Sequence, residues 1–293
     1  MTDLSSYAIN NTVTFTTNPH GLTKIIIQSD LAEAEIYLQG ANITHFQPHG
    51  QKPLLFDAKS IEMDPTKTLH AGIPLCWPWF GPHPSDTTKP QHGFARTSLW
   101  EIQKTQLHDD GKVEIVLALT QNASTRKLFD FDFRLEITFS IAKTLSVSLT
   151  TTNTDTKAFS FTDAIHTYFA IGDIAQMKIK GVQETPFIDY TDEQKQKSET
   201  LPLSIDKEVN RVYIPTLESC TIVDEVLKRE IIVSKKGSNS TTIWNPWKEN
   251  GIHDLVNDKY RYFVCIESVN ALEDRIHLEP SQSHTITQLI SIA

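Results

Sequence analysis

The most regular feature of the chain is an alternation of hydrophobic and polar residues over many short stretches. Every odd-numbered residue from Phe133 to Ile141 is hydrophobic, and the residues between them are mostly polar. A period of two residues is typical of a strand with one buried face. Turn-forming Asn, Asp, Gly, Pro and Ser separate further runs of this kind, so the pattern predicts a succession of short strands. These runs occupy 13–17, 23–38, 113–120, 145–151, 175–182, 229–235, 240–245, 260–269 and 284–292.

Helical patterns are scarce by comparison. The segment 124–130 has room for one or two turns, and 191–201 resembles a charged surface excursion, but neither carries a sustained apolar stripe at helical spacing. Many strands with few short helices predict an all-β fold, a large antiparallel β-sandwich or a barrel. No linker, long single-sign charge run or fixed-period repeat divides the chain, so we expect one domain over 1–293.

Composition and charge narrow the classes of function. With 39% hydrophobic and 22% charged residues, the chain has an ordinary globular composition and can bury a sizeable core. The formal charge of -9, with acidic and basic residues mixed along the chain, argues against nucleic acid as a partner. Three cysteines far apart, without CxxC spacing, favour a reducing compartment. Neither a signal-peptide pattern nor an apolar run of membrane-spanning length occurs, so we expect a soluble, cytoplasmic protein without membrane contact.

His166 is the first candidate for acid–base chemistry. If the segment 159–169 is one strand, alternation places His166 on a polar, small-residue face together with Thr162 and Tyr168. A histidine there can transfer protons near neutral pH. The alternative is a structural histidine that is hydrogen-bonded on a half-exposed strand.

Glu267 is the second candidate. In the strand predicted at 260–269, its face also carries Phe263 and Cys265, so the carboxylate is expected to be desolvated. Desolvation raises the pKa of a carboxyl group and suits it to proton transfer near neutrality. The alternative is a structural ion pair, for instance with Arg96 or Arg261.

Candidate binding residues lie between 70 and 96. Gln91, His92 and Arg96 offer an amide, an imidazole and a guanidinium fork within six residues, a set that can bind hydroxyls and an anionic group. The preceding loop, 70–84, is rich in proline and tryptophan, and aromatic side chains beside polar donors suit sugars. The alternative is an ordinary loop, with "IWNPW" at 243–247 as plain core.

Signatures of other site types are missing from the sequence. It contains no GxGxxG, P-loop, HExxH or GxSxG pattern. His70, Cys76, His83 and His92 match no common zinc spacing, so we expect no metal at these residues.

Seven motifs together resemble those of a known family. They resemble, in order and approximate spacing over roughly residues 35–290, the glucose-6-phosphate 1-epimerases, also called hexose-6-phosphate mutarotases. The resemblance implies the galactose-mutarotase-like fold, a single-domain antiparallel β-sandwich, and catalysis without metal or cofactor on a small sugar phosphate, in a protein expected to be a monomer. The motifs are "LQGANITHFQPHG", "GIPLCWPWFGP", "QHGFAR", "IHTYFAIGDI", "NRVY", "WNPW" and "FVCIES".

The same resemblance implies roles for individual residues. His166, in the HTYF motif, and Glu267, in the CIE motif, match the family's catalytic pair. Anomers interconvert by opening of the hemiacetal, for which Glu267 would remove the proton of the C1 hydroxyl while protonated His166 supplies one to the ring oxygen. Gln91, His92 and Arg96 match residues that contact the substrate.

Two substrate-binding positions depart from the family pattern. His70 stands where an arginine is usual, and Asn210 stands where an aspartate precedes Arg211. A histidine lacks the bidentate fork of arginine and is cationic only at lower pH, so a phosphate contact through His70 would depend on pH. Asparagine keeps a hydrogen-bonding carbonyl without the charge.

These departures leave three hypotheses for function. The leading one is interconversion of the α and β anomers of an aldohexose 6-phosphate, glucose 6-phosphate above all. A second keeps the mechanism but changes the substrate to an unphosphorylated or differently modified sugar. A third is a non-catalytic sugar-phosphate-binding module, which the joint presence of an acid and a base disfavours.

Overall fold

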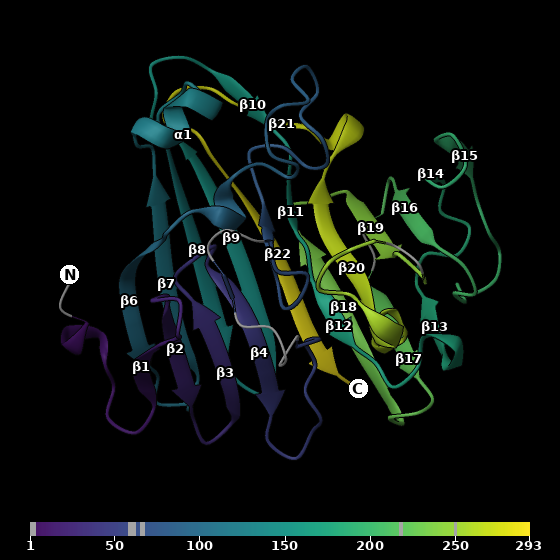
Figure 1. Cartoon of the computed structure of the whole chain (residues 1–293), viewed down its shortest axis with the longest axis horizontal. Coiled ribbons are helices and arrows are strands. Elements are labelled where there is room, and N and C mark those ends of the chain that lie inside the picture. Colours follow the sequence, from purple (N-terminus) through teal and green to yellow (C-terminus); the bar gives the residue numbers. More distant parts are fainter. Residues whose placement is uncertain (1–3, 58–62, 65–67, 217–218, 249–250) are drawn as a thin grey trace.

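Antiparallel sheets make up nearly all the regular structure of the computed structural model, which describes residues 4–57, 63–64, 68–216, 219–248 and 251–293 (Figure 1). This confirms the prediction of an all-β sandwich with few short helices. Among the described residues, no helix has the length and apolar character needed to cross a membrane.

The first of two eight-stranded sheets contains the longest strands. Along β8, buried and half-buried residues alternate without exception, as the sequence pattern predicts. In spatial order, the first sheet consists of β13 (Met177–Lys180), β17 (Cys220–Asp224), β18 (Arg229–Lys236), β22 (Ser283–Ile292), β9 (Leu145–Asn153), β8 (Phe133–Ile141), β7 (Val113–Thr120) and β6 (Glu101–Leu107).

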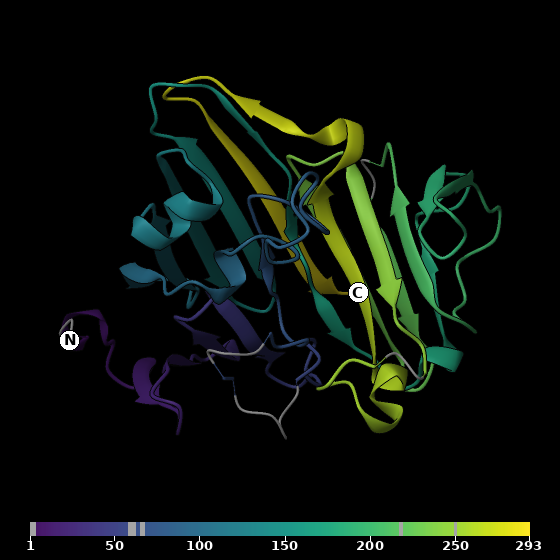
Figure 2. The ribbon, with the colours of Figure 1, turned by 45° about the horizontal axis from the view of Figure 1, so that its top comes forward.

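The second eight-stranded sheet carries the candidate site. Figure 2 shows its central strands, β16, β19 and β20, side by side. In spatial order, the second sheet consists of β15 (Lys195–Lys197), β14 (Phe187–Asp189), β16 (Val209–Tyr213), β19 (Ser240–Asn245), β20 (Phe263–Asn270), β11 (Asp163–Ile165) and β5 (Leu75–Cys76), with β12 (Tyr168–Ala170) also paired to β20.

Smaller elements complete the fold. A four-stranded sheet contains β1 (Val13–Thr17), β2 (Thr23–Gln28), β3 (Ala32–Tyr37) and β4 (Asn42–Pro48), while β10 (Phe159–Phe161) pairs with β21 (Ile276–Leu278). The helix expected near 124–130 is α1 (Ala123–Leu128), which begins at a capping box formed by Asn122 and Thr125. Short 3-10 helices are η1 (Ser5–Tyr7), η2 (Ala95–Thr97), η3 (Ile174–Gln176), η4 (Asn257–Tyr262) and η5 (Leu272–Asp274).

Strand β20 is buried along its whole length because it lies between the first sheet and the candidate site. On the side of the first sheet, the Gln288 amide of β22 donates to the Ile266 carbonyl at 3.2 Å and to Ser268 Oγ at 3.1 Å. The Thr167 hydroxyl donates to the same Gln288 side chain. Because side chains alternate along a strand, Glu267 then points to the opposite face, away from the first sheet.

The prediction of one continuous strand over 159–169 is wrong. The segment is divided into β10, β11 and β12, and its parts have different partners: β10 pairs with β21, whereas β11 and β12 pair with β20. On its other side β11 pairs with β5 of the proline-rich loop. The backbone N–H groups of Thr162 and His166 donate to the Pro78 and Pro74 carbonyls, both at 3.1 Å, at the two ends of that pairing.

The prediction of a strand over 260–269 is correct only from Phe263 onward. Residues 260–262 form the last part of η4 instead. The excursion predicted at 191–201 is exposed or half-exposed as expected, although its residues Lys195–Lys197 form the short edge strand β15.

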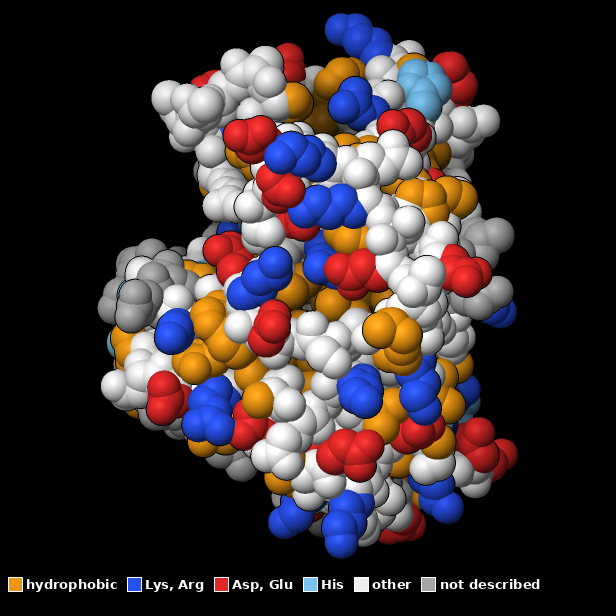
Figure 3. Space-filling model, turned by 90° about the vertical axis from the view of Figure 1, so that its right-hand side faces the viewer, with side chains coloured by type: hydrophobic (Ala, Val, Ile, Leu, Met, Phe, Trp, Pro, Cys, Tyr) orange, Lys and Arg blue, Asp and Glu red, His pale blue; other side chains and the backbone are white. Residues whose placement is uncertain are grey.

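Charged side chains are interspersed over the face of the molecule in Figure 3. Acidic and basic residues alternate across it without a large area of one sign. This is not the pattern of a surface that tracks a phosphate backbone.

The proline-rich loop is anchored by Trp77. Its indole is fully buried and lies 4.5 Å from the Phe133 ring, centroid to centroid. Gly93 then passes so close to this residue that a Cβ on Gly93 would lie 1.9 Å from the Trp77 carbonyl oxygen. The approach of the two backbones holds 91–96 against the loop.

The closeness of Gly93 to Trp77 predicts that two glycine-to-alanine substitutions lower stability by different amounts. Gly93 has φ +70° and Gly50 has φ +80°, but a Cβ on Gly50 would meet nothing within 4 Å. Alanine at either position carries the left-handed backbone cost of about 1–2 kcal/mol. We expect Gly93→Ala to lower the free energy of unfolding by about 1–3 kcal/mol more than Gly50→Ala, because only Gly93 also has overpacking. Urea unfolding measures both, and equal losses would contradict the close approach of Gly93 to Trp77.

Candidate active site

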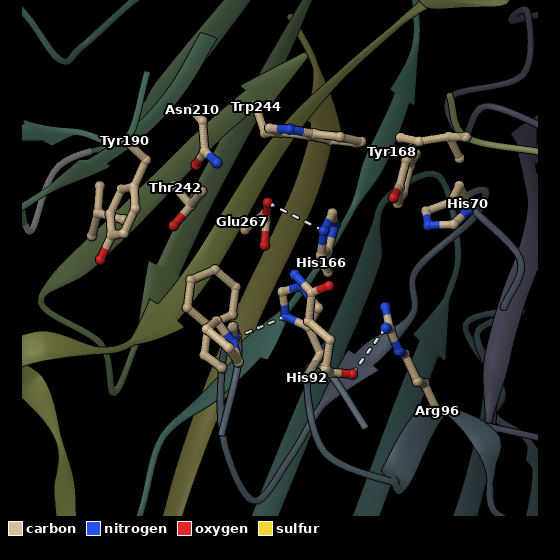
Figure 4. A pocket seen from close by; sticks show the side chains of 16 residues that line it. His70, His92, Arg96, His166, Tyr168, Tyr190, Asn210, Thr242, Trp244 and Glu267 are labelled. Carbon is tan, nitrogen blue, oxygen red and sulfur yellow. Dashed lines mark hydrogen bonds and ion pairs between the residues drawn. The ribbon is translucent and has the colours of Figure 1, made fainter. Parts of the chain in front are cut away.

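One cavity of about 340 Å³ brings together all seven residues that the sequence analysis proposed for the site (Figure 4). Further residues in its wall include Phe80, Tyr168, Tyr190, Thr242 and Trp244. The seven proposed residues are His70, Gln91, His92, Arg96, His166, Asn210 and Glu267.

The floor of this cavity is the face of the second sheet. In the register of its strands, Thr242 of β19 lies opposite Glu267 of β20, and Asn210 of β16 lies opposite Trp244. Directly opposed residues in an antiparallel pair project to the same face, so the sheet alone fixes these four side chains beside one another. The loops between 70 and 96 supply the facing wall.

His166 and Glu267 form a buried pair. His166 Nε2 lies 3.5 Å from Glu267 Oε1, and their side chains are 9% and 1% exposed. Burial raises the pKa of the Glu267 carboxyl well above its ordinary value. Burial, followed by the charges of His92, Arg96 and His70, lowers the pKa of the His166 imidazole well below its own. The two groups therefore hold one proton between them at neutral pH, which burial places on Glu267.

The structural ion pair considered for Glu267 is not formed with either arginine. Arg261 pairs with Asp173, and Arg96 donates from Nη2 to the Gln91 carbonyl at 3.0 Å. In the described part of the chain, the ionisable side chain that contacts Glu267 is His166. Its second oxygen, Oε2, is buried with no hydrogen-bond partner there.

Aromatic rings hold the His166 imidazole in place. The Tyr168 ring stacks on it at 4.9 Å with an interplanar angle of 7°, and the Trp244 indole meets it edge-on at 6.0 Å. Burial raises the pKa of the Tyr168 phenol well above its ordinary value, so this ring is neutral. The imidazole is thus fixed in orientation by packing, while its Nδ1 is buried without a partner among the described residues.

His92 is a neutral hydrogen-bond donor to the cavity. Its Nδ1 accepts the Gly81 backbone N–H at 3.1 Å, which leaves the proton on Nε2. Burial, with the charges of Arg96 and His70, lowers the pKa of this imidazole to about 3. Its ring lies 5.8 Å from that of His166, so the Nε2–H donor stands beside the buried pair.

The two ends of the cavity differ in charge. In Figure 4, His70 and Arg96 lie on one side of the His166–Glu267 pair, and Asn210, Thr242 and Tyr190 lie on the other. His70 is held by Asp254, whose Oδ1 lies 2.7 Å from His70 Nδ1. One end therefore suits an anionic group and the other suits neutral hydroxyls.

Two groups of side chains could hold a metal ion among the residues that the structure describes. In the group that contains Cys265, burial raises the pKa of the thiol well above its ordinary value, which makes it a poor ligand. In the group that contains His70, the Asp254 carboxylate already contacts Nδ1 of that histidine. The two groups are His70, His253 and Asp254, and His166, Cys265 and Glu267.

Some residues of the site carry no signal in the sequence. Thr242 enters the cavity through its register opposite Glu267, which alternation along one strand does not reveal, and Tyr190 directly follows the end of β14. Trp244 lines the cavity, although the sequence left its motif open to a core role. Asp254 lies 184 residues from His70 in a polar segment, so only the fold brings the two together.

Comparison with known proteins agrees with this geometry. The model of the family described as aldose 1-epimerase matches residues 23–291. A protein of Escherichia coli (strain K12), named "Putative glucose-6-phosphate 1-epimerase", is 31% identical over 93% of this chain and 91% of its own length.

Solved structures show the same fold. The crystal structure of a "putative mutarotase" from Salmonella typhimurium superimposes with a TM-score of 0.90 and 28% identity, over 98% of this chain and 95% of its own. A galactose mutarotase-like protein from Clostridium acetobutylicum superimposes with a TM-score of 0.77 and 14% identity, over 96% and 98% of the two chains. The latter likeness establishes the fold alone. From the family match and the 31% relative, the chain belongs to the aldose 1-epimerase family.

Proposed function

We propose that this protein interconverts the α and β anomers of an aldohexose 6-phosphate, and that His166 and Glu267 carry the reaction. The observation that carries the proposal is the buried pair, 3.5 Å apart, in the wall of a cavity with one cationic end. Support for the phosphorylated sugar comes from the relative named "Putative glucose-6-phosphate 1-epimerase".

Ring opening uses the single proton that the pair holds. With the proton on His166, the Glu267 carboxylate removes the proton of the C1 hydroxyl while the imidazolium donates its own to the ring oxygen. The bond between C1 and the ring oxygen breaks, and C1 becomes a carbonyl. The pair then has its proton on Glu267, the distribution that burial favours in the free protein.

Ring closure reverses the same transfers. After rotation about the C1–C2 bond, neutral His166 removes the proton of the open-chain hydroxyl, which attacks the other face of the carbonyl. Glu267 returns its proton to the carbonyl oxygen. The pair holds one proton before and after each turnover, so the reaction needs no external acid or base.

The remaining residues orient the sugar. The Nε2–H of His92 donates to a sugar oxygen beside the pair, and Arg96 and His70 take the phosphate at their end of the cavity. Asn210 and Thr242 take hydroxyls at the other end. The Trp244 indole supplies an apolar surface for the ring.

One observation favours the second substrate class considered above, an unphosphorylated sugar. Among the described residues that line the cavity, Arg96 is the one permanent cation. Phosphate sites commonly use more than one such group.

A buried acid–base pair has no purpose in a non-catalytic sugar-phosphate-binding module, so this third hypothesis is the weakest.

The proposal also covers the location, oligomeric state and partners of the protein. We place the protein in the cytoplasm as a monomer without cofactor, metal, nucleic-acid or membrane partner. The three free, buried cysteines, Cys76, Cys220 and Cys265, fit a reducing compartment.

Anomer exchange of glucose 6-phosphate tests the proposed function directly. We expect the protein to accelerate the exchange measured by NMR, and Glu267→Gln to lower kcat by about 10²- to 10⁴-fold because the proton acceptor is lost. Glu33→Gln, at an exposed carboxylate on β3, is the matched control and keeps the full rate. A wild-type rate equal to that of Glu267→Gln would refute the assignment of Glu267.

The same substitution should stabilise the fold. A group that binds its proton more tightly in the folded state makes stability fall as pH rises from its unfolded to its folded pKa. Burial raises the pKa of Glu267, so wild-type stability falls with pH from about 4.5 upward. Burial lowers the pKa of His166, and its opposing contribution is complete above about pH 6.5.

We therefore expect Glu267→Gln to be more stable than the wild type at pH 8. This advantage shrinks by up to about 1.4 kcal/mol per pH unit as pH is lowered to 6.5, because folding of the wild type takes up a proton and this uptake costs less at lower pH. Urea unfolding across this pH range measures the difference. A constant difference would show that the Glu267 carboxyl is ionised in the folded protein.

A further inference from the structure

A second cavity shares its wall with the first. It measures about 620 Å³, and His70, Gln91 and Arg96 line both cavities. His253 also lines the second cavity, and no acidic residue is among its described lining residues. The shared wall is therefore where a negatively charged substituent of a sugar is best accommodated.

Asp254 holds His70 at this wall through two contacts. Its Oδ2 accepts the His70 backbone N–H at 2.7 Å, and its Oδ1 lies 2.7 Å from His70 Nδ1. The Asp254 carboxyl is fully buried, whereas the His70 side chain is 22% exposed. Burial pushes the pKa of Asp254 upward, but the hydrogen bonds and charge of His70, with the charge of His253, bring it below its ordinary value.

An ionised carboxylate at Nδ1 decides how His70 meets a ligand. It keeps a proton on Nδ1 in both charge states of the ring, so only Nε2 changes on protonation. In the neutral ring, Nε2 is a lone pair and repels a phosphate oxygen. In the protonated ring, Nε2–H donates a charge-assisted hydrogen bond to the same oxygen.

We propose that Asp254 is a positioning residue for the phosphate of the substrate. It fixes His70 so that protonation of Nε2 sets how strongly the enzyme prefers a phosphorylated sugar to a plain one. This inference rests on the proposed function and adds a residue and a pH dependence to it.

The other ionisable groups around His70 do not supply the same switch. Arg96 stays cationic, and the Tyr168 ring, 6.5 Å away and edge-on, stays neutral because burial raises the pKa of its phenol. Burial lowers the pKa of both His92 and His166, which keeps them neutral.

Two further groups lie on the side of Asp254. The His253 ring is 6.1 Å from that of His70, and its Nδ1 is 3.9 Å from Asp254 Oδ1. Lys259 donates to the Asp254 backbone carbonyl at 3.2 Å rather than to the carboxylate. Among the described residues, His253 is therefore the neighbour that the experiment must separate from His70.

The test compares kcat/KM for glucose 6-phosphate with kcat/KM for glucose, between pH 5.5 and 8. Because the phosphate ester itself loses a charge near pH 6, the wild-type ratio is divided by that of His70→Gln at each pH. We expect the divided ratio to rise at least about tenfold from pH 8 to pH 5.5, the effect of one charge-assisted hydrogen bond. For His70→Arg, whose side chain has a fixed charge, the ratio divided in the same way should be high and should not change with pH.

Asp254→Asn separates positioning from mere support of the fold. Without the carboxylate, the proton on Nε2 is less stabilised, so the rise should move to lower pH, which a merely structural role of Asp254 would not cause. A divided ratio that stays flat in the wild type would overturn the inference. So would an undivided ratio that rises as steeply in His70→Gln as in the wild type but stays flat in His253→Gln.

Failure of the proposed function has a different signature. In that case the wild type accelerates anomer exchange of neither sugar at any pH. Activity on both sugars with parallel pH profiles leaves the proposed function intact and removes only the role of Asp254 and His70.

Discussion

The site depends above all on the desolvation of one carboxyl group. Glu267 is 1% exposed on a strand whose eight residues are all buried, and the imidazole of His166 is the ionisable group that contacts it in the described part of the chain. Taking a carboxylate out of water favours its protonated form, and taking an imidazolium out of water favours its neutral form. The proton is therefore shared by two groups whose environments oppose charge on either. Such a pair can exchange a proton with a substrate at little cost in either direction.

The two eight-stranded sheets exclude water from the His166–Glu267 pair. Behind β20, the Gln288 side chain bonds to the carbonyl of Ile266 and to Ser268, so the polar groups on that face are satisfied without water. On the facing side, the rings of Tyr168 and Trp244 pack against His166. The acid–base groups thus lie on or beside strands, whereas His70, Gln91 and Arg96 at the cationic end of the cavity come from the loops and the short 3-10 helix between 70 and 97. Loops can change without disturbing the sheet, which is how one mechanism can serve different sugars within a fold.

The sequence predicts local features of this arrangement better than its long-range contacts. Alternation identifies β8 because the residues of that strand face a core on one side only. It also indicates the burial of Glu267, since its apolar neighbours Phe263 and Cys265 share its strand. Alternation fails over 159–169, where the strand partners lie far away in sequence and change along the segment: β10 pairs with β21, and β11 pairs with β20 and β5. Alternation cannot identify Asp254, because nothing in its segment of the sequence indicates that this acid is fully buried against His70.

The cationic end of the cavity also connects substrate binding to the state of the proton. The charges of Arg96 and His70 are among the causes that lower the pKa of His166, and the charge of Arg96 also lowers the pKa of Glu267. A phosphate bound at Arg96 and His70 cancels part of that field, and at distances within the Debye length of about 8 Å salt does little to screen it. The pKa of both groups of the pair is then expected to rise, since Arg96 lowers the pKa of Glu267 as well as that of His166. In the proposed reaction, a higher pKa of His166 favours the imidazolium that donates to the ring oxygen, so the anionic substituent of the sugar would favour the acid that acts on its other end.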